Sequence, residues 1–174
     1  AYNPLTQWSD GDYPGADNHQ DDLAVIAAHG APLASDDHGG TPGTATALTG
    51  GPASETAGTI GSRSDVDVFQ VPGCPSAVPV HVLPSDPGPD LDVALRVLDR
   101  SGAPTQPAAA PTGRLDATVT LPASAVASYV EVDGGGDTGY SDYGSLGRYT
   151  VAVEACGGAP PASTVPSAPL DVSA

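Results

Sequence analysis

Residues 91–98 read LDVALRVL, and this stretch decides the fold. Val93, Leu95 and Val97 recur at every second residue, so in an extended chain their side chains point to the same face. Gly, Pro and Asp residues bound the stretch on both sides, which is typical of a β-strand between turns. The same alternation returns elsewhere in the chain, at Val66/Val68, Val78/Val80/Val82, Leu115/Ala117/Val119/Leu121, Val130/Val132 and Val151/Val153.

Short alternating strands separated by turn residues predict an all-β fold. We expect six or seven strands in an antiparallel β-sandwich of jelly-roll-like type, although the pattern does not give the strand order. Residues 36–58 are rich in Gly, Thr, Ala and Pro and are expected to form a loop, with one short strand near residues 45–48. Residues 103–113, rich in Pro and Ala, are expected to form a long exposed hairpin connection.

The first 35 residues differ in composition from the rest of the chain and carry the one clear helix signal. Asp17 and Asn18 are candidate N-caps, an apolar stretch follows at residues 23–27, and His29-Gly30 is a plausible stop. We therefore predict a short N-terminal helical segment. Because so short a helix is marginal by itself in water, it must pack either on this sandwich or on another domain.

The chain is strongly acidic. Its 174 residues include five Arg, no Lys and 21 acidic residues, for a formal net charge of -16. Nucleic acid is excluded as a partner because backbone binding needs a basic footprint, and anionic membrane surfaces are disfavoured for the same reason. No apolar run approaches the ~20 residues that a membrane-spanning helix needs, so no membrane insertion is expected.

The two cysteines, Cys74 and Cys156, each lie just beyond a strand-like stretch. An even pair in an acidic chain rich in Pro and Gly favours a disulfide and an oxidising, extracellular compartment. Two reduced, buried thiols are the alternative. A zinc site is a poor interpretation because no second Cys or His lies at ligand spacing from either cysteine.

Acidic residues come in close pairs, among them Asp36/Asp37 and Asp65/Asp67. In an extended strand Asp65 and Asp67 would share a face, and two converging carboxylates are costly unless a cation lies between them. Oxygen ligands of this kind suit Ca²⁺. The alternative is an acidic surface exposed to solvent, which keeps a secreted protein soluble.

Catalytic motifs are absent from the sequence: it contains neither HExxH nor G-x-S-x-G. No catalytic residue is therefore predicted, and an enzyme built on carboxylates would be supported only if hydrolysis were lost on a change such as Asp142→Asn. Tyr140, Asp142 and Tyr143 form a Gly-flanked loop whose rings suit stacking on a sugar or peptide. The alternative is that these rings cover the open end of the sandwich.

Several stretches together resemble the bacterial pre-peptidase C-terminal domain. They are residues 36–45, the Gly-Thr-Ile-Gly turn at 58–61 and the D-x-D-aromatic strand at 65–69. The run GYSDYGSLGRY at residues 139–149 resembles the late motif of the variant attached to secreted, reprolysin-like zinc metalloproteases. Residues 2–24 are similar to the segment that follows the Met-turn of those proteases.

The resemblance implies a β-sandwich and, in collagen-binding members, calcium held between the first segment and the D-x-D strand. Carried over, Asp37, Asp65 and Asp67 are the expected ligands, with Asp36 next. Where relatives often have Asn or Asp, this chain has Gly39-Gly40, so part of the ligand shell is expected to be missing. No zinc is expected on this chain.

The expected organisation is the end of an upstream metalloprotease domain at 1–35, a sandwich at 36–156, and a Pro-rich linker at 157–174. The last six residues resemble the start of a fibronectin type III module. We expect a secreted, non-catalytic accessory module of a metalloprotease precursor, with the upstream catalytic domain and an extracellular protein or polysaccharide as partners. The alternative is a structural subunit of an extracellular layer or filament.

Overall fold

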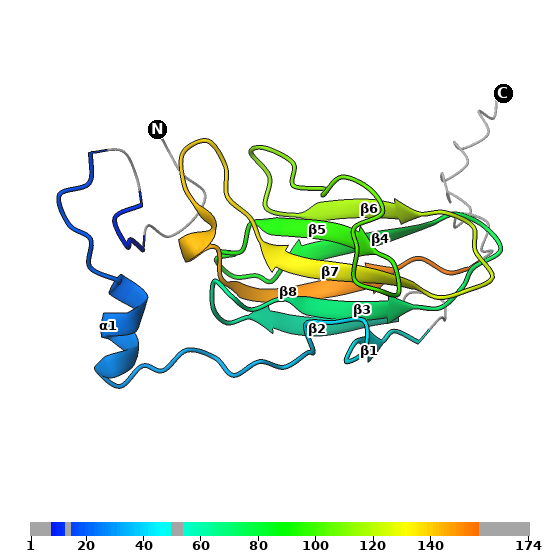
Figure 1. The fold of residues 1–174 in the computed structure, drawn as a ribbon, viewed down its shortest axis with the longest axis horizontal. Helices are drawn as coiled ribbons and strands as arrows, with labels where there is room; N and C mark the ends of the chain where they lie inside the picture. The colour runs from blue at the N-terminus through cyan, green and yellow to red at the C-terminus, as the bar shows by residue number, and fades with distance from the viewer. Residues whose placement is uncertain (1–7, 13–14, 50–53, 157–174) are drawn as a thin grey trace, which may run out of the picture.

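The protein folds as two β-sheets packed face to face (Figure 1). The computed structural model describes residues 8–12, 15–49 and 54–156. One sheet has the order β1-β3-β7-β5 and the other β2-β8-β4-β6, and every pairing except β1 with β3 is antiparallel. The predicted antiparallel β-sandwich is thus confirmed. Its elements are α1 (Asp22–Ala28), β1 (Thr46–Ala47), β2 (Ser54–Ile60), β3 (Asp67–Val71), β4 (Val78–Pro84), β5 (Val93–Leu98), β6 (Ala117–Leu121), β7 (Ser128–Gly134), the 3-10 turn η1 (Asp142–Gly144) and β8 (Gly147–Val153).

Successive strands from β2 to β8 alternate between the two sheets. No two neighbours in the chain therefore pair with each other, and β2 pairs instead with the last strand, β8. This nested order is of the jelly-roll kind, in which the chain crosses repeatedly from one layer to the other.

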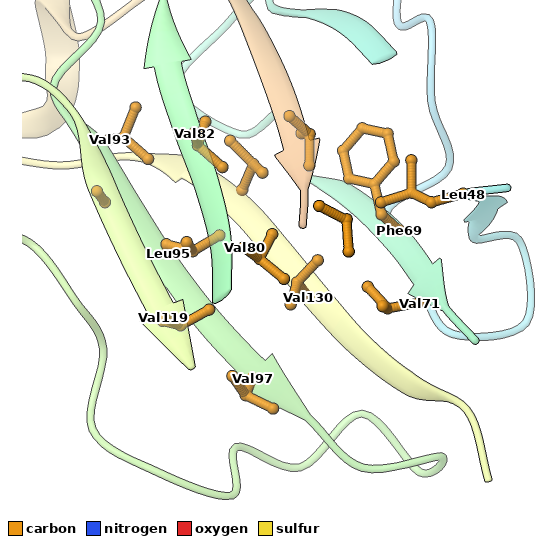
Figure 2. Packing of buried hydrophobic residues seen from close by; sticks show 14 of the residues in the cluster. Leu48, Phe69, Val71, Val80, Val82, Val93, Leu95, Val97, Val119 and Val130 are labelled. Atoms are coloured by element: carbon orange, nitrogen blue, oxygen red, sulfur yellow. The ribbon is translucent and has the colours of Figure 1, made fainter. Parts of the chain in front are cut away.

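The core lies between the sheets and consists mainly of Val and Leu side chains (Figure 2). Val80 and Val82 of β4 are fully buried, whereas Leu83 on the opposite face is 50% exposed. The period of two therefore marks the inner face of β4 correctly. In β3 it does not, because Phe69 and Val71 face the main core, whereas Val68 packs on the other side with Leu98 and Tyr129. Tyr149 of β8 and Phe69 of β3 are the largest fully buried side chains, and their rings meet edge to face at 6.3 Å.

Strand β2 corrects one expectation. Residues 36–58 were expected to form a loop with one short strand near residues 45–48, and β2 begins within this range. The short strand is β1, but β2 adds a second one whose sequence has no alternating large apolar residues. The reason lies in β8: Gly58 faces Tyr149 so closely that an added Cβ would overlap the tyrosine ring. Gly58 interrupts the apolar pattern by which a strand is recognised in the sequence, and its lack of a side chain leaves space for the Tyr149 ring.

The connection from β5 to β6 corrects a second expectation. Residues 103–113 were expected to form a hairpin connection, but β5 and β6 lie in different sheets. The connection runs along the free edge of β5, and most of residues 103–113 are exposed, as expected. Ala109 and Leu95 exchange backbone hydrogen bonds of 2.8 and 2.9 Å, and the Thr105 amide donates to the Val97 carbonyl at 2.8 Å. This pairing covers an edge that would otherwise be open to another chain.

Helix α1 begins later than expected. Its N-cap is Asp21, whose side chain accepts a hydrogen bond from the Ala24 amide, whereas Asn18 accepts one from Gln20 ahead of the helix. The helix ends at His29-Gly30, as expected, with Gly30 at a positive φ of 101°. None of its residues is buried, and in Figure 1 it stands beside the sandwich. No helix among the described residues is long and apolar enough to cross a bilayer.

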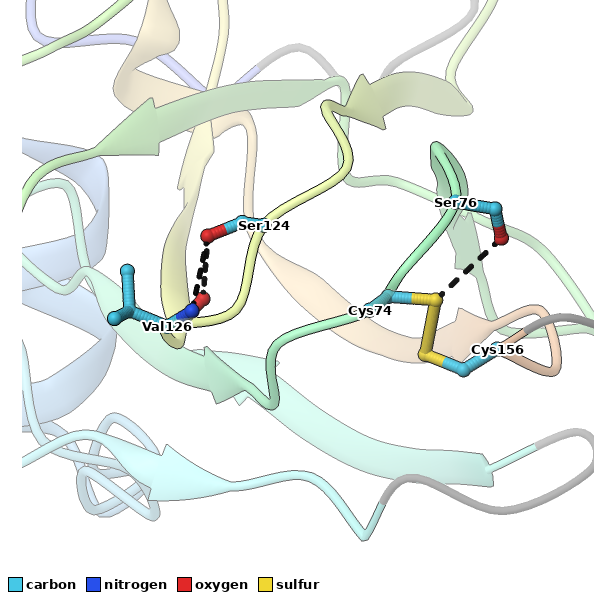
Figure 3. Close-up of a disulfide and its surroundings, with 5 residues drawn as sticks. All are labelled: Cys74, Ser76, Ser124, Val126 and Cys156. Atoms are coloured by element: carbon cyan, nitrogen blue, oxygen red, sulfur yellow. Dashed lines mark hydrogen bonds between the residues drawn. A yellow bond between two sulfur atoms is a disulfide. The ribbon is translucent and has the colours of Figure 1, made fainter.

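A disulfide joins Cys74 and Cys156, which follow β3 and β8 respectively (Figure 3). The cross-link therefore ties one strand from each sheet together at the same end of the sandwich. The Cys74 carbonyl also accepts a hydrogen bond of 2.8 Å from the Ser124 amide. The expected Pro-rich linker at 157–174 and residues 2–7 and 13–14 of the protease-like segment lie outside the described residues.

Candidate cation site

Three carboxylates from two segments of the chain meet beside the start of β3. One oxygen each of Asp36, Asp65 and Asp67 lies within 4.8 Å of the other two. Asp36 ends the extended segment that leads from α1, Asp65 belongs to the turn before β3, and Asp67 is the first residue of β3. Three negative charges at this spacing repel one another unless protons or a cation neutralise them.

Asp67 lies at the edge of the core. It shares the inward face of β3 with Phe69 and Val71, and its exposed fraction is 0%. Its Oδ2 accepts a hydrogen bond from the Tyr149 hydroxyl, but its buried Oδ1 has no hydrogen-bond partner among the described residues. Burial, with smaller contributions from the charges of Asp65 and Asp37, raises the pKa of Asp67 to about 7.

Asp65 is fixed by its own turn. The Gly61 amide donates a hydrogen bond of 2.6 Å to its Oδ2, and the Asp65 amide donates to the Ser62 carbonyl at 3.1 Å. Burial raises the pKa of Asp65, and the charges of Asp36 and Asp37 add to the rise. The cluster is thus electrostatically strained when it holds no cation.

Asp37, the first of the carried-over ligands, lies beside the group of three. Its Oδ1 accepts a hydrogen bond of 3.2 Å from the Thr59 amide on the free edge of β2. Asp36, which the resemblance implied only as the next candidate after Asp37, is the residue that lies near Asp65 and Asp67. The sequence could not separate these neighbours, because alternate side chains of an extended segment point in opposite directions.

His38 is a structural residue that the sequence analysis did not single out. Its Nε2 lies 2.9 Å from the Ala57 carbonyl and its Nδ1 lies 2.8 Å from the Thr46 hydroxyl, so it connects β2 with β1. Its ring packs against Phe69 at 4.8 Å. Only its position directly after the acidic pair could have suggested a role near the site.

The donor set fits a calcium ion. Carboxylate oxygens are the ligands that Ca²⁺ prefers, and a buried oxygen without a partner is stabilised by a cation placed against it. The missing side chains at Gly39-Gly40 have a packing cause: an added Cβ at Gly40 would lie 2.9 Å from the Val66 carbonyl oxygen. The chain therefore offers Asp36, Asp65 and Asp67 without a further side-chain ligand from these glycines.

In EDTA, stability is expected to fall as the pH rises from about 4 to about 7. Since the pKa of Asp67 is raised in the folded state, the folded protein binds more protons than the unfolded chain in this range. The loss attributable to Asp67 is at most about 4 kcal/mol, and it is complete above pH 7. Urea unfolding at several pH values would measure it. Asp67→Asn should flatten the profile, and an equal slope in both proteins would contradict the assignment.

The predicted binding loop holds the N-terminal segment. The Tyr143 ring is buried, its hydroxyl donates to Asp21 Oδ1 at 2.6 Å, and it accepts from the Leu23 amide at 2.9 Å. Asp142 forms an ion pair of 2.6 Å with Arg63. Tyr140 is half-buried and donates to Asp92 at 2.9 Å. Ligand binding by Tyr140, Asp142 and Tyr143 stays a prediction.

Tyr143→Phe is expected to release the start of α1 without unfolding the sandwich. The change removes two hydrogen bonds between the loop and the start of the helix, one donated to the Asp21 carboxylate and one accepted from the Leu23 amide. Hydrogen exchange measured by mass spectrometry should show faster exchange over residues 22–28. Tyr140→Phe is the matched control, because its hydroxyl contacts Asp92 and not the helix. Unchanged protection of α1 in Tyr143→Phe would contradict this role.

Comparison with known proteins gives weak similarities. No protein-family model matches the chain, and no curated protein matches it. Among solved structures, the chain is similar to the pre-peptidase C-terminal domain of collagenase from Bacillus anthracis, with 17% identity, a TM-score of 0.42, and coverage of 63% of this chain and 96% of that one. It is also similar to PliG of Aeromonas hydrophila, a periplasmic inhibitor of g-type lysozyme, with 16% identity, a TM-score of 0.42, and coverage of 64% and 95%.

Proposed function

We propose that this chain is a non-catalytic accessory module of a secreted protein, and that one Ca²⁺ bound by Asp36, Asp65 and Asp67 stabilises it. One observation carries the proposal: Asp67 is fully buried, and its Oδ1, beside two other carboxylates, has no partner among the described residues. Buried oxygens without a hydrogen-bond partner are rare in proteins. Asp10 and Asp92 each have one too, but among the described residues only that of Asp67 lies in a group of three carboxylates, where a cation or a proton would satisfy it.

A cation explains the cluster better than a proton does. One proton on Asp67 would leave Asp36 and Asp65 facing each other as like charges. Arg63, the nearest arginine in the sequence, is engaged elsewhere, by Asp142 and Asp10 at 2.6 and 3.2 Å. The two ring nitrogens of His38 are engaged by Ala57 and Thr46. Mg²⁺ is less suitable than Ca²⁺ because it demands small, near-ideal octahedral geometry and gives up its water reluctantly.

The extracellular, accessory role has two supports. The Cys74–Cys156 disulfide favours an oxidising compartment. The sequence resemblance to the pre-peptidase C-terminal domain of reprolysin-like proteases favours a place beside a metalloprotease catalytic domain. In that setting the module would stabilise the protease or direct it to an extracellular protein, glycan or cell surface.

Isothermal titration of chelator-treated protein with CaCl₂ tests the proposal. We expect one site per chain, and much weaker binding of MgCl₂ under the same conditions. Asp67→Asn should bind Ca²⁺ at least about tenfold more weakly because it loses one ligand charge, whereas Asp17→Asn, at an exposed site before α1, should bind as the parent does. No calcium binding at millimolar concentration would refute the proposal.

A further inference from the structure

The acidic cluster opens onto a hollow at the surface. The hollow has a volume of about 260 Å³, and its lining includes Asp36, Asp65, Gly40, Ser62 and Ser64. Asp67 lies behind these residues, buried in the core. A cation held by the three carboxylates would therefore have protein on one side and the open hollow on the other.

The chain leaves the coordination shell of that cation incomplete. Each carboxylate already accepts a hydrogen bond at one oxygen. The donor is the Tyr149 hydroxyl for Asp67, the Gly61 backbone amide for Asp65, and the His38 backbone amide for Asp36. This arrangement favours one ligating oxygen from each residue. Ca²⁺ takes about 6–8 oxygen ligands, so several positions would be left for water or for oxygens of another molecule.

Charge selects the kind of molecule that can fill these positions. Three carboxylates and one Ca²⁺ leave a net negative charge at the site, Asp37 lies alongside, and the whole chain carries a formal charge of -16. An anionic ligand would be repelled. Neutral hydroxyl oxygens are hard ligands without charge, and the Ser62 and Ser64 hydroxyls, 3.3 Å apart, offer further hydrogen bonds in the hollow.

We propose that the bound calcium ion, facing this hollow, coordinates the adjacent hydroxyl groups of a neutral glycan. The inference rests on the proposed calcium site and names the ligand class that this site would recognise. Two neighbouring hydroxyls on one sugar ring can replace two waters at once, which lowers the entropic cost of filling two positions.

The test is retention of the purified chain on immobilised mannan, galactan and dextran, in calcium and in EDTA. We expect retention on at least one of these neutral polysaccharides in calcium, its loss in EDTA, and none on polygalacturonate. Ser64→Trp, at an exposed position, fills the hollow without removing a carboxylate and should reduce retention at least about tenfold. Ser101→Trp, in an exposed turn, is the matched control.

Calcium-dependent thermal stabilisation of each variant separates the two proposals. If Ser64→Trp keeps the calcium response and loses retention, the glycan proposal is supported. If calcium stabilises the protein but none of the neutral polysaccharides retains it, or if retention survives EDTA, the glycan proposal is overturned and the calcium site stands. If calcium neither binds nor stabilises, both fail. Retention on polygalacturonate alone would overturn the choice of a neutral ligand.

Discussion

Calcium at a hundredfold excess over its dissociation constant is expected to raise the free energy of unfolding by about 2.7 kcal/mol. A ligand that binds only the folded state stabilises it by mass action, and the acidic cluster assembles only when β3 is paired and Asp36 lies against it. For a domain of this size the gain corresponds to roughly 5–10 °C in the melting temperature. Thermal unfolding at constant pH and ionic strength, with EDTA or with CaCl₂, measures it.

Asp65→Ala should abolish this response. The variant loses a ligand and the hydrogen bond from the Gly61 amide, but it also relieves the repulsion among the carboxylates, so its basal melting temperature will change as well. The informative quantity is therefore the difference between calcium and EDTA. Asp17→Ala removes one negative charge from an exposed site outside the cluster and should respond like the parent. A full calcium response in Asp65→Ala would show that the ligands are assigned wrongly.

Removing the disulfide is expected to have an effect of similar size. The cysteines are 82 residues apart in the chain, and a loop of that length gives about 4.5 kcal/mol of stabilisation in the loop-entropy model. Measured losses in small secreted domains are about 2–5 kcal/mol. The Cys74→Ser, Cys156→Ser double variant should therefore unfold at a much lower urea concentration than the parent.

A control for this measurement is Ser76→Ala, which removes the hydroxyl that lies 3.7 Å from the Cys74 sulfur and leaves the cross-link in place. Its urea midpoint should stay close to that of the parent. If the double variant also keeps the parental midpoint, the cross-link contributes nothing to stability and the sandwich alone accounts for it.

The sandwich could be predicted because its inner faces alternate in the sequence. Val80 and Val82 or Leu95 and Val97 mark a buried face without any knowledge of what packs against it. Strand β2 could not be found in this way, since Gly58 is small on account of Tyr149, a residue 91 positions later in the chain. Local periodicity reveals strands that contribute large apolar side chains to the core. It misses strands whose small residues accommodate a large side chain from a neighbouring strand.

The candidate site was only partly predictable for a similar reason. The spacing of Asp65 and Asp67 predicts a shared face if both residues lie in the strand, but β3 begins at Asp67 and Asp65 belongs to the turn before it. The spacing also does not say whether that face is buried. The burial of Asp67 follows from the inward position of Phe69 and from Tyr149 on the opposite sheet. The choice of Asp36 over Asp37 depends on how the segment after α1 meets β2, which no local pattern specifies.

The alternation of strands between the two sheets has a kinetic consequence. Because β2 pairs with β8, no ladder containing β2 can form until almost the whole sandwich sequence has been synthesised. Every antiparallel ladder joins strands distant in the chain, and such topologies fold slowly, in about milliseconds to seconds. The sheet that contains β2 and β4 therefore cannot be completed before the C-terminal strand β8 has been made.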